Sequence, residues 1–311
     1  MAAIGVPNLR ATGVAEDVTR PKRWRDAVLK GVPNEGVRFL FDLAFPWSYP
    51  GGPMAGRPAA AAPGGGAVVQ DMSEHANGSV SLGTSGGGAV INYAGGGFDF
   101  SASALASGGL DRGIIAPASV LADIFTPFGG ASQRYLFMMY LKLPVVADWQ
   151  VTSAGLLTFA SDKPYSTDPS LLNIGFGLGG GSEGQIQSRR QTALNAQNQS
   201  AVRAEAGDFG TVCQLGIWRN AAGQGLRLRS LTSGLAAKIA TQAAGADNAL
   251  DFSADTFAFG RTAAFAANGG NLMNGFRIYR AMVENLARSG RDPVAVLDAD
   301  FARAQARAAF S

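Results

Sequence analysis

Hydrophobic and polar residues alternate with a period of two along much of this chain. In residues 37–45 every odd position is apolar, and Arg38 and Asp42 fall between them. In residues 226–231 two leucines alternate with two arginines before the pattern ends. Because successive side chains of a strand point to opposite faces of a sheet, this pattern predicts half-buried β-strands.

The clearest alternation lies in residues 256–283. Phe257 and Phe259 share one face of a first predicted strand, and Phe276 and Ile278 share one face of a second. A loop rich in glycine and asparagine joins the two strands. We expect these four side chains to be core residues that hold two sheets together, and not to form a binding site.

Short strands separated by glycines continue through the middle of the chain. Further strands are predicted at residues 68–70, 89–93, 98–100, 135–143, 156–161, 172–178, 185–190 and 211–219. Convincing helical patterns are nearly absent from this region, and such a series is typical of two stacked antiparallel sheets. We therefore predict an all-β sandwich domain over residues 37–285.

Residues 286–311 differ in character and predict a short C-terminal helix. Asp292 and Pro293 form a plausible helix start, since proline suits the first helical position. Leu297 and Phe301 stand four residues apart and therefore share one helix face. The pattern favours a helix packed on the sandwich over an exposed helix that binds a partner.

Residues 1–36 are predicted to form a separate N-terminal arm. Arg23, Trp24 and Arg25 lie in a short basic segment, and tryptophan and arginine are favoured at the centres of protein interfaces. One interpretation is an arm that anchors the chain to another subunit through these three residues. The other is a solvated surface helix.

Composition narrows the classes of function. Of the 311 residues 16% are charged, and the net charge of +3 is too weak and too local to predict nucleic-acid binding. No apolar run reaches membrane-spanning length, so no membrane insertion is expected, and the N-terminus lacks a signal-peptide pattern. With Cys213 as the single cysteine, we expect a buried structural thiol, no disulfide and synthesis in a reducing cytoplasm.

Residues suited to catalysis are scarce. His75 is the only histidine, and no G-x-S-x-G sequence that would mark a serine nucleophile lies near it. The glycine-rich residues 175–185 lack the G-K-[ST] ending of a phosphate-binding loop. We therefore predict no enzyme activity, no cofactor and no transition-metal site, while a calcium site built from oxygen ligands stays open.

Several aromatic and arginine side chains could bind sugars. Aromatic rings stack on the C–H faces of sugars, and arginine favours anionic polysaccharides. The candidates that look exposed are Trp47, Tyr49, Trp149, Tyr165, Arg189 and Arg190. For each of them, ordinary packing is the alternative. The first two belong to residues 46–67, a loop rich in proline and glycine that is either functional or disordered.

Three segments, in their order, give the chain a resemblance to a known family of folds. They are the stretch from Trp149 through LLTFAS, the pair VCQLGIWRN and LRLRSL, and DTFAFG followed by FRIYR. Over residues 37–285 the chain resembles concanavalin A-like and laminin-G-like jelly rolls. The glucanases of that superfamily carry acidic triplets such as E-x-D-x-E on one strand, and no such triplet occurs here. The residues after 281 look like the tail of such modules in phage and prophage structural proteins.

The resemblance implies a structural protein of a virion or phage-like particle, assembled in the bacterial cytoplasm and displayed on the particle surface. Such a spike, tail fibre or tail-associated protein would bind cell-surface polysaccharide for host attachment and contact other particle proteins through its arm. A homo-oligomer is implied, with a trimer favoured. The alternatives are a head-decoration or connector protein without receptor binding and, last, a polysaccharide-degrading enzyme.

Overall fold

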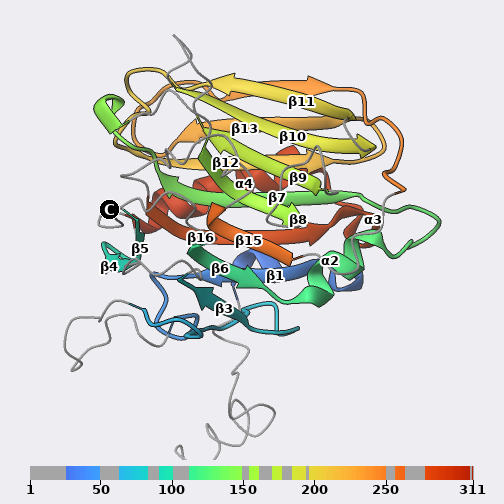
Figure 1. Cartoon of the computed structure of the whole chain (residues 1–311), viewed down its shortest axis with the longest axis horizontal. Coiled ribbons are helices and arrows are strands. Elements are labelled where there is room, and N and C mark those ends of the chain that lie inside the picture. Colours follow the sequence, from blue (N-terminus) through green and yellow to red (C-terminus); the bar gives the residue numbers. More distant parts are fainter. Residues whose placement is uncertain are drawn as a thin grey trace, which may run out of the picture.

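Two antiparallel sheets stacked face to face form the body of the protein (Figure 1). The computed structural model describes residues 26–49, 63–82, 91–100, 112–148, 154–160, 170–176, 184–193, 196–249, 256–262, 277–308 and 310. Each strand pair that it describes is antiparallel. The predicted all-β sandwich with a short C-terminal helix is confirmed.

The strand order in each sheet departs from the order along the chain. Sheet A runs β14 (Lys238–Gln242), β13 (Gln224–Ser230), β12 (Val212–Arg219), β7 (Tyr135–Lys142), β16 (Arg277–Asn285), β5 (Gly97–Asp99) and β4 (Asn92–Ala94), and β1 (Val37–Asp42) also pairs with β16. Sheet B runs β11 (Ala196–Arg203), β10 (Gln185–Ala193), β9 (Ser170–Phe176), β8 (Ala154–Ala160), β15 (Thr256–Thr262), β6 (Arg112–Ala116), β3 (Gly78–Ser81) and β2 (Val68–Val69).

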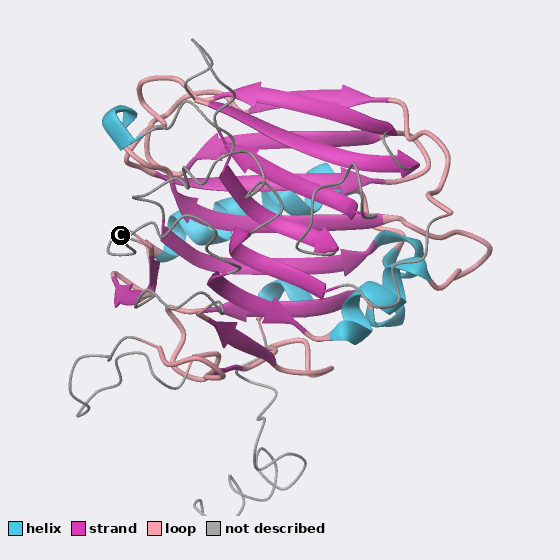
Figure 2. Ribbon diagram, viewed as in Figure 1, coloured by secondary structure: helices cyan, strands magenta, loops and turns pink. Residues whose placement is uncertain are grey.

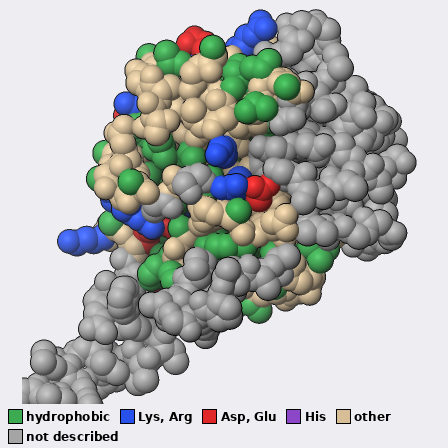
Figure 3. All heavy atoms as spheres, turned by 90° about the vertical axis from the view of Figure 1, so that its left-hand side faces the viewer, with side chains coloured by type: hydrophobic (Ala, Val, Ile, Leu, Met, Phe, Trp, Pro, Cys, Tyr) green, Lys and Arg blue, Asp and Glu red, His purple; other side chains and the backbone are tan. Residues whose placement is uncertain are grey.

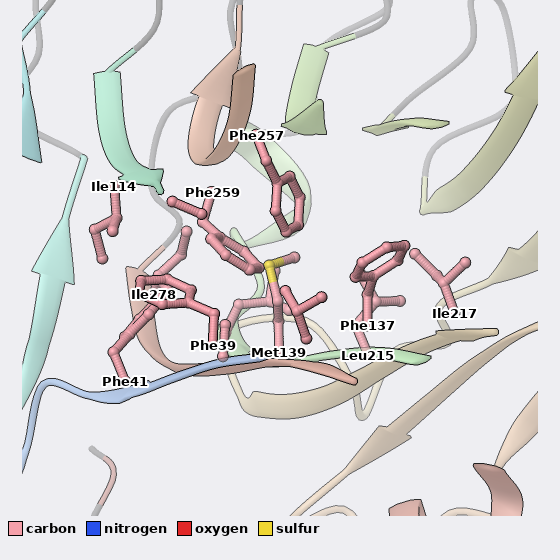
Figure 4. Close-up of a cluster of buried hydrophobic side chains, with 14 of the residues drawn as sticks. Phe39, Phe41, Ile114, Phe137, Met139, Leu215, Ile217, Phe257, Phe259 and Ile278 are labelled. Carbon is pink, nitrogen blue, oxygen red and sulfur yellow. The ribbon is translucent and has the colours of Figure 1, made fainter. Parts of the chain in front are cut away.

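Aromatic and aliphatic side chains fill the space between the sheets (Figure 4). Phe257 and Phe259 of β15 point from sheet B toward sheet A, where the ring of Phe259 lies 6.2 Å from that of Phe39. Ile278 is buried in the same cluster, so the predicted core role is confirmed for these residues, while Phe276 lies outside the described residues. Complete burial of each ring stabilises the fold by about 1.5–3 kcal/mol.

A register shift distributes the residues of β1 over two faces. The pairing of β1 with β16 shifts between Val37 and Phe39. Phe39 and Phe41 face the core between the sheets, as predicted, whereas Val37 packs in the apolar layer outside sheet A. Phe45, which follows the end of β1, packs there too. Because a bulge inserts a residue and reverses the alternation, the prediction of one shared face is wrong at Val37.

Helices cover the outer face of sheet A (Figure 2). The longest is α4 (Pro293–Arg307), and it begins where predicted: Asp292 accepts a hydrogen bond from the Ala295 amide at 2.7 Å. Leu297 and Phe301 are buried against the sheet, which confirms the packed helix. The other helical elements are α2 (Ala118–Phe125), α3 (Leu286–Ser289) and the 3₁₀ turns η2 (Ala27–Leu29), η3 (Pro33–Glu35) and η4 (Val146–Asp148).

The end of the predicted arm belongs to this outer layer. Val28 and Leu29 of η2 are buried in the same apolar cluster as α4. The sandwich therefore includes chain that lies before residue 37. Arg23, Trp24 and Arg25, the predicted anchoring residues, lie outside the described residues.

A buried arginine connects the outer layer to the sheet. Arg280 of β16 is 2% exposed and contacts Asp26 at 2.7 Å, Asp300 of α4 at 3.1 Å and Asp42 of β1 at 3.4 Å. Burial would raise the pKa of the Asp26 carboxyl, but the charge and hydrogen bonds of Arg280 outweigh it and hold that pKa below its ordinary value. We call these four residues the Arg280 cluster.

Candidate functional site

Two neighbouring strands at one end of sheet B carry polar side chains on their outer face. In β10, Ile186 points into the core, so alternate residues from Gln185 onward point outward. The register of β10 with β11 pairs Gln185 with Arg203, Gln187 with Ala201, Arg189 with Gln199 and Gln191 with Gln197. Opposed residues of antiparallel strands share a face. We call the resulting surface the amide face: Gln185, Gln187, Arg189, Gln191, Gln197, Gln199 and Arg203.

Hydrogen bonds order the side chains of the amide face. Gln187 Nε2 donates to Gln185 Oε1 at 3.1 Å, and Arg189 Nε donates to Gln187 Oε1 at 3.2 Å. Gln199 and Arg203 are exposed, whereas Gln187 and Gln191 are buried. A pre-ordered ladder loses less side-chain freedom on binding than isolated surface glutamines do.

Arg189 also has a backbone partner on the next strand of sheet B. The backbone register pairs Arg189 with Asn173 of β9, and Asn173 with Thr158 of β8. On β10 and β11, the amide face contains glutamine and arginine and no acidic residue. Amides donate and accept hydrogen bonds, and a guanidinium donates several in one plane. This surface can therefore bind a ligand that presents many hydroxyl or carboxylate oxygens.

Arg190, predicted together with Arg189, lies on the opposite side of β10. Its side chain is 2% exposed, and Nε donates to Gln224 Oε1 of β13 at 3.0 Å. Its other nitrogens donate to the carbonyls of Ala244 and Ala246, each at 3.0 Å. The expectation of an exposed Arg190 is wrong because consecutive strand residues face opposite sides. It therefore fastens residues 244–246, which follow β14 of sheet A, to β10 of sheet B.

The predicted aromatic candidates do not join the amide face where the structure describes them. Tyr49 is 4% exposed and packs in the core, 5.5 Å from the ring of Tyr93 and 4.9 Å from that of Phe98. Trp47 is half-buried in the apolar layer outside sheet A. The expectation that Tyr49 is exposed is therefore wrong. Trp149 and Tyr165 lie outside the described residues.

Sequence reasoning missed the glutamines of the amide face, although a signal for them exists. Glutamine recurs at positions 185, 187 and 191 and again at 197 and 199, always at an even spacing. Even spacing on a strand places side chains on one face. Grouping the polar residues of the predicted strand by odd and even position places Arg189 on the face of the glutamines and Arg190 on the opposite face.

The reactive residue types take structural positions. Cys213 is buried, and burial raises the pKa of its thiol to about 12, which confirms the predicted structural thiol. His75 is half-buried, with Nε2 3.0 Å from the Val37 carbonyl oxygen. Within the described residues, no three His, Cys, Asp or Glu side chains are grouped to hold a metal ion. No helix described here is long and apolar enough to cross a bilayer.

Charged side chains on the surface occur as mixed groups. In the side view of Figure 3, basic side chains lie beside acidic ones, with apolar and uncharged surface between the groups. Elsewhere the buried Arg227 of β13 contacts the exposed Asp298 of α4 at 2.7 Å. Ion pairs of this kind hold neighbouring elements together, and the charge on the side shown in Figure 3 is mixed. It does not form a broad basic surface on the described part of that side.

Comparison with known proteins places the architecture among β-sandwiches. No protein-family model matches the sequence, and no curated protein is significantly similar to it. The chain is similar to the binding domain of botulinum neurotoxin serotype D, with a TM-score of 0.50 and 11% identity over 89% of this chain and 53% of that one. At this identity the likeness shows a shared fold.

Two further solved structures are similar at lower scores. A Trypanosoma rangeli sialidase in complex with 2,3-difluorosialic acid gives a TM-score of 0.47 and 10% identity over 88% of this chain. The match covers 34% of the sialidase, so this chain spans about a third of that protein's length. Lectin I-B4 from Griffonia simplicifolia gives 0.42 and 10% identity over 62% of this chain and 89% of the lectin.

Proposed function

We propose that this protein binds carbohydrate through the amide face of sheet B. The observation that supports the proposal is the row of glutamines and arginines at even spacing on β10 and β11. Sugars present hydroxyl groups at short, regular intervals, and side-chain amides and guanidinium groups match them as hydrogen-bond partners. Among the predicted sugar-binding residues that the structure describes, Arg189 is the one that lies on this face.

Glycan-array screening of the whole chain, followed by calorimetric titration, tests the proposal. Arg189→Ala and Gln199→Ala should each weaken binding by about 2- to 12-fold, the value of one hydrogen bond of about 0.5–1.5 kcal/mol. Gln305→Ala is the matched control, because Gln305 is an exposed glutamine on α4, outside sheet A. Equal loss in the control, or no loss in both variants of the amide face, would contradict the proposed site.

We further propose that the chain is a surface subunit of a virion or phage-like particle, such as a spike, fibre or tail-associated protein. The described chain begins at Asp26, which Arg280 holds in the layer outside sheet A. The amide face belongs to the other sheet. Attachment through residues 1–25, with Arg23, Trp24 and Arg25 as anchors, would therefore leave recognition to the opposite side of the sandwich.

Deletion of residues 1–25 tests this attachment. The deletion ends there because Val28 and Leu29 are buried, so a longer deletion would damage the sandwich. We expect the shortened chain to fold, to bind polysaccharide and to be missing from purified particles seen by electron microscopy. Retention on particles would contradict the anchoring role. Failure of the full-length particle protein to bind host polysaccharide would favour a decoration or connector protein, and release of reducing ends would identify an enzyme.

A further inference from the structure

Strand β11 is a long edge strand of sheet B in the part of the chain that the structure describes. It stands at the end of the strand order and at the margin of the molecule in Figure 1. It has eight residues, whereas the strands at the other sheet ends, β14, β4 and β2, have five, three and two. Within the described part of the chain, no strand or loop pairs with the outer edge of β11.

Two hydrogen bonds identify the backbone groups that face this edge. The Ala204 amide donates to the Gly184 carbonyl at 2.8 Å, so even-numbered residues of β11 direct their backbone groups toward β10. Gln191 of β10 lies opposite Gln197, but its carbonyl accepts from Asn248 Nδ2 at 2.7 Å and so points away from β11. This pair therefore exchanges no backbone hydrogen bonds. Odd-numbered residues therefore direct their backbone groups outward. Gln197, Gln199 and Ala201 each offer an N–H and a C=O at the edge.

The edge carries few of the features that prevent strands from pairing between molecules. Natural edge strands are protected by lysine, proline, inward-pointing charge, bulges or very short length. Residues 196–202, AQNQSAV, contain no charged residue and no proline. The register of β11 with β10 is regular from Arg203 to Gln197, and the one shift lies beyond it. An uncharged, regular strand of this length is a template for another strand.

We propose that β11 pairs with β11 of a second copy of this chain, in antiparallel orientation, about a two-fold axis at Gln199. Antiparallel pairing makes the edge self-complementary, as a two-fold interface requires. Gln199 then lies opposite Gln199 of the second copy, and Gln197 opposite Ala201. Both pairs join residues whose backbone groups point outward, so each pair exchanges two backbone hydrogen bonds.

The charges at this edge permit self-pairing. Arg203 is the single charged residue of β11. With the axis at Gln199, the arginines of the two copies lie at opposite ends of the paired segment, and like charges do not meet. On the outer face the two Gln199 side chains lie next to each other, where amides can donate to and accept from one another.

Edge pairing would also join two amide faces into one surface. Arg189 lies beside Gln199 in the register of β10 and β11, so the row would continue from one copy to the next. Sheet B would then extend without interruption through both copies. This consequence rests on the proposed carbohydrate binding, whereas the pairing itself does not. A polysaccharide that crosses both copies would bind about 10²- to 10⁴-fold more tightly than to a single copy.

Sedimentation equilibrium of the whole chain without glycan tests the pairing. We expect a species with twice the mass of the 32.0 kDa chain. Ala201→Pro should yield monomer, because it removes an outward N–H and leaves the bonds to β10 intact. Gln199→Lys should also yield monomer, because it places two ammonium groups opposite each other. Gln305→Lys, the same change on α4, should stay dimeric.

Thermal melts of both edge variants distinguish loss of pairing from loss of the fold. Both variants should unfold cooperatively, which identifies a folded monomer. A monomeric wild-type chain at the highest soluble concentration would overturn the proposal. Trimeric mass, or a dimer that persists in both edge variants, would overturn it as well. If the wild type is dimeric and no glycan binds, the pairing stands and the proposed function fails.

Discussion

Replacement of Arg280 by methionine should destabilise the protein through one residue of the Arg280 cluster. Asp300 would keep its contact with Arg303 at 2.8 Å, and Asp42 would keep its contact with Arg307 at 2.8 Å. In the described structure Asp26 has Arg280 as its ion-pair partner. The variant should therefore remove the ion pair of one buried carboxylate, rather than of three, and leave Asp26 with the Val28 amide at 2.8 Å and the charge of Arg303.

The magnitude follows from that single broken pair. Loss of one partner from a buried ion pair costs about 3–5 kcal/mol. With an unfolding entropy of about 2.1 cal/mol/K per residue over 311 residues, the melting temperature at pH 7 should fall by about 5–8 °C. Differential scanning calorimetry measures the change directly.

The loss should depend on pH in a defined direction. In the wild type, Arg280 holds the pKa of Asp26 below the usual 3.8, so this carboxylate contributes stability above pH 3.8 that is lost as the pH falls through its folded pKa. Without Arg280, burial, which raises the pKa of Asp26, is opposed only by the Val28 amide and the charge of Arg303, so this pKa rises relative to that in the wild type. The variant therefore loses most of the stability that the Asp26 carboxylate contributes above pH 3.8. The difference between the two proteins should be largest near neutral pH and shrink toward acid.

Arg277→Met on the same strand is the matched control. Arg277 contacts Asp99 at 2.7 Å, but the two side chains are 17% and 16% exposed. An ion pair that water reaches contributes about 0–1 kcal/mol. An equal loss in both variants would refute the assignment of the effect to burial. A loss in Arg280→Met that stays constant from pH 7 to acid would refute the role of the Asp26 carboxylate.

Three further predictions test the core and the outer layer. Phe259→Ala should cost about 3–5 kcal/mol of unfolding free energy in urea titrations, because it opens a cavity between the sheets. Gly216→Ala should cost about 1–3 kcal/mol and loosen α4 in hydrogen exchange, since the new methyl group would lie 2.5 Å from Leu297 Cδ1. The Cys213 thiol, with its pKa raised to about 12, should react with maleimide only after unfolding; labelling of the native protein would contradict its burial.

Local alternation predicted many of the strands because it reflects the two faces of each strand, whereas β3, β6, β11 and β14 were missed. Residues 226–231 were predicted as a strand, and β13 spans Gln224–Ser230. Residues 185–190 were predicted, and β10 spans Gln185–Ala193. The Asp292–Pro293 helix start was also visible, since capping depends on adjacent residues.

Features that depend on distant partners were not predictable from local pattern. The bulge that turns Val37 outward exists only in the pairing of β1 with β16, more than two hundred residues away in sequence. Tyr49 is buried because Tyr93 and Phe98 pack against it, and no neighbouring residue indicates this contact. The even spacing of the glutamines in the amide face is visible in the sequence. The register that places β10 beside β11 is set by the pairing of the two strands and is not visible there.

The ends of the described chain converge on one side of the sandwich. Asp26 and Phe310 line the same pocket of about 90 Å³, together with Arg280 and Asp300. The amide face belongs to the sheet on the other side. A fluorescent protein or a bead linked after residue 311, or to Asp26 of the chain that lacks residues 1–25, would therefore sit behind the sandwich. Molecules immobilised in this way would share one orientation and present the same face to a glycan-coated surface.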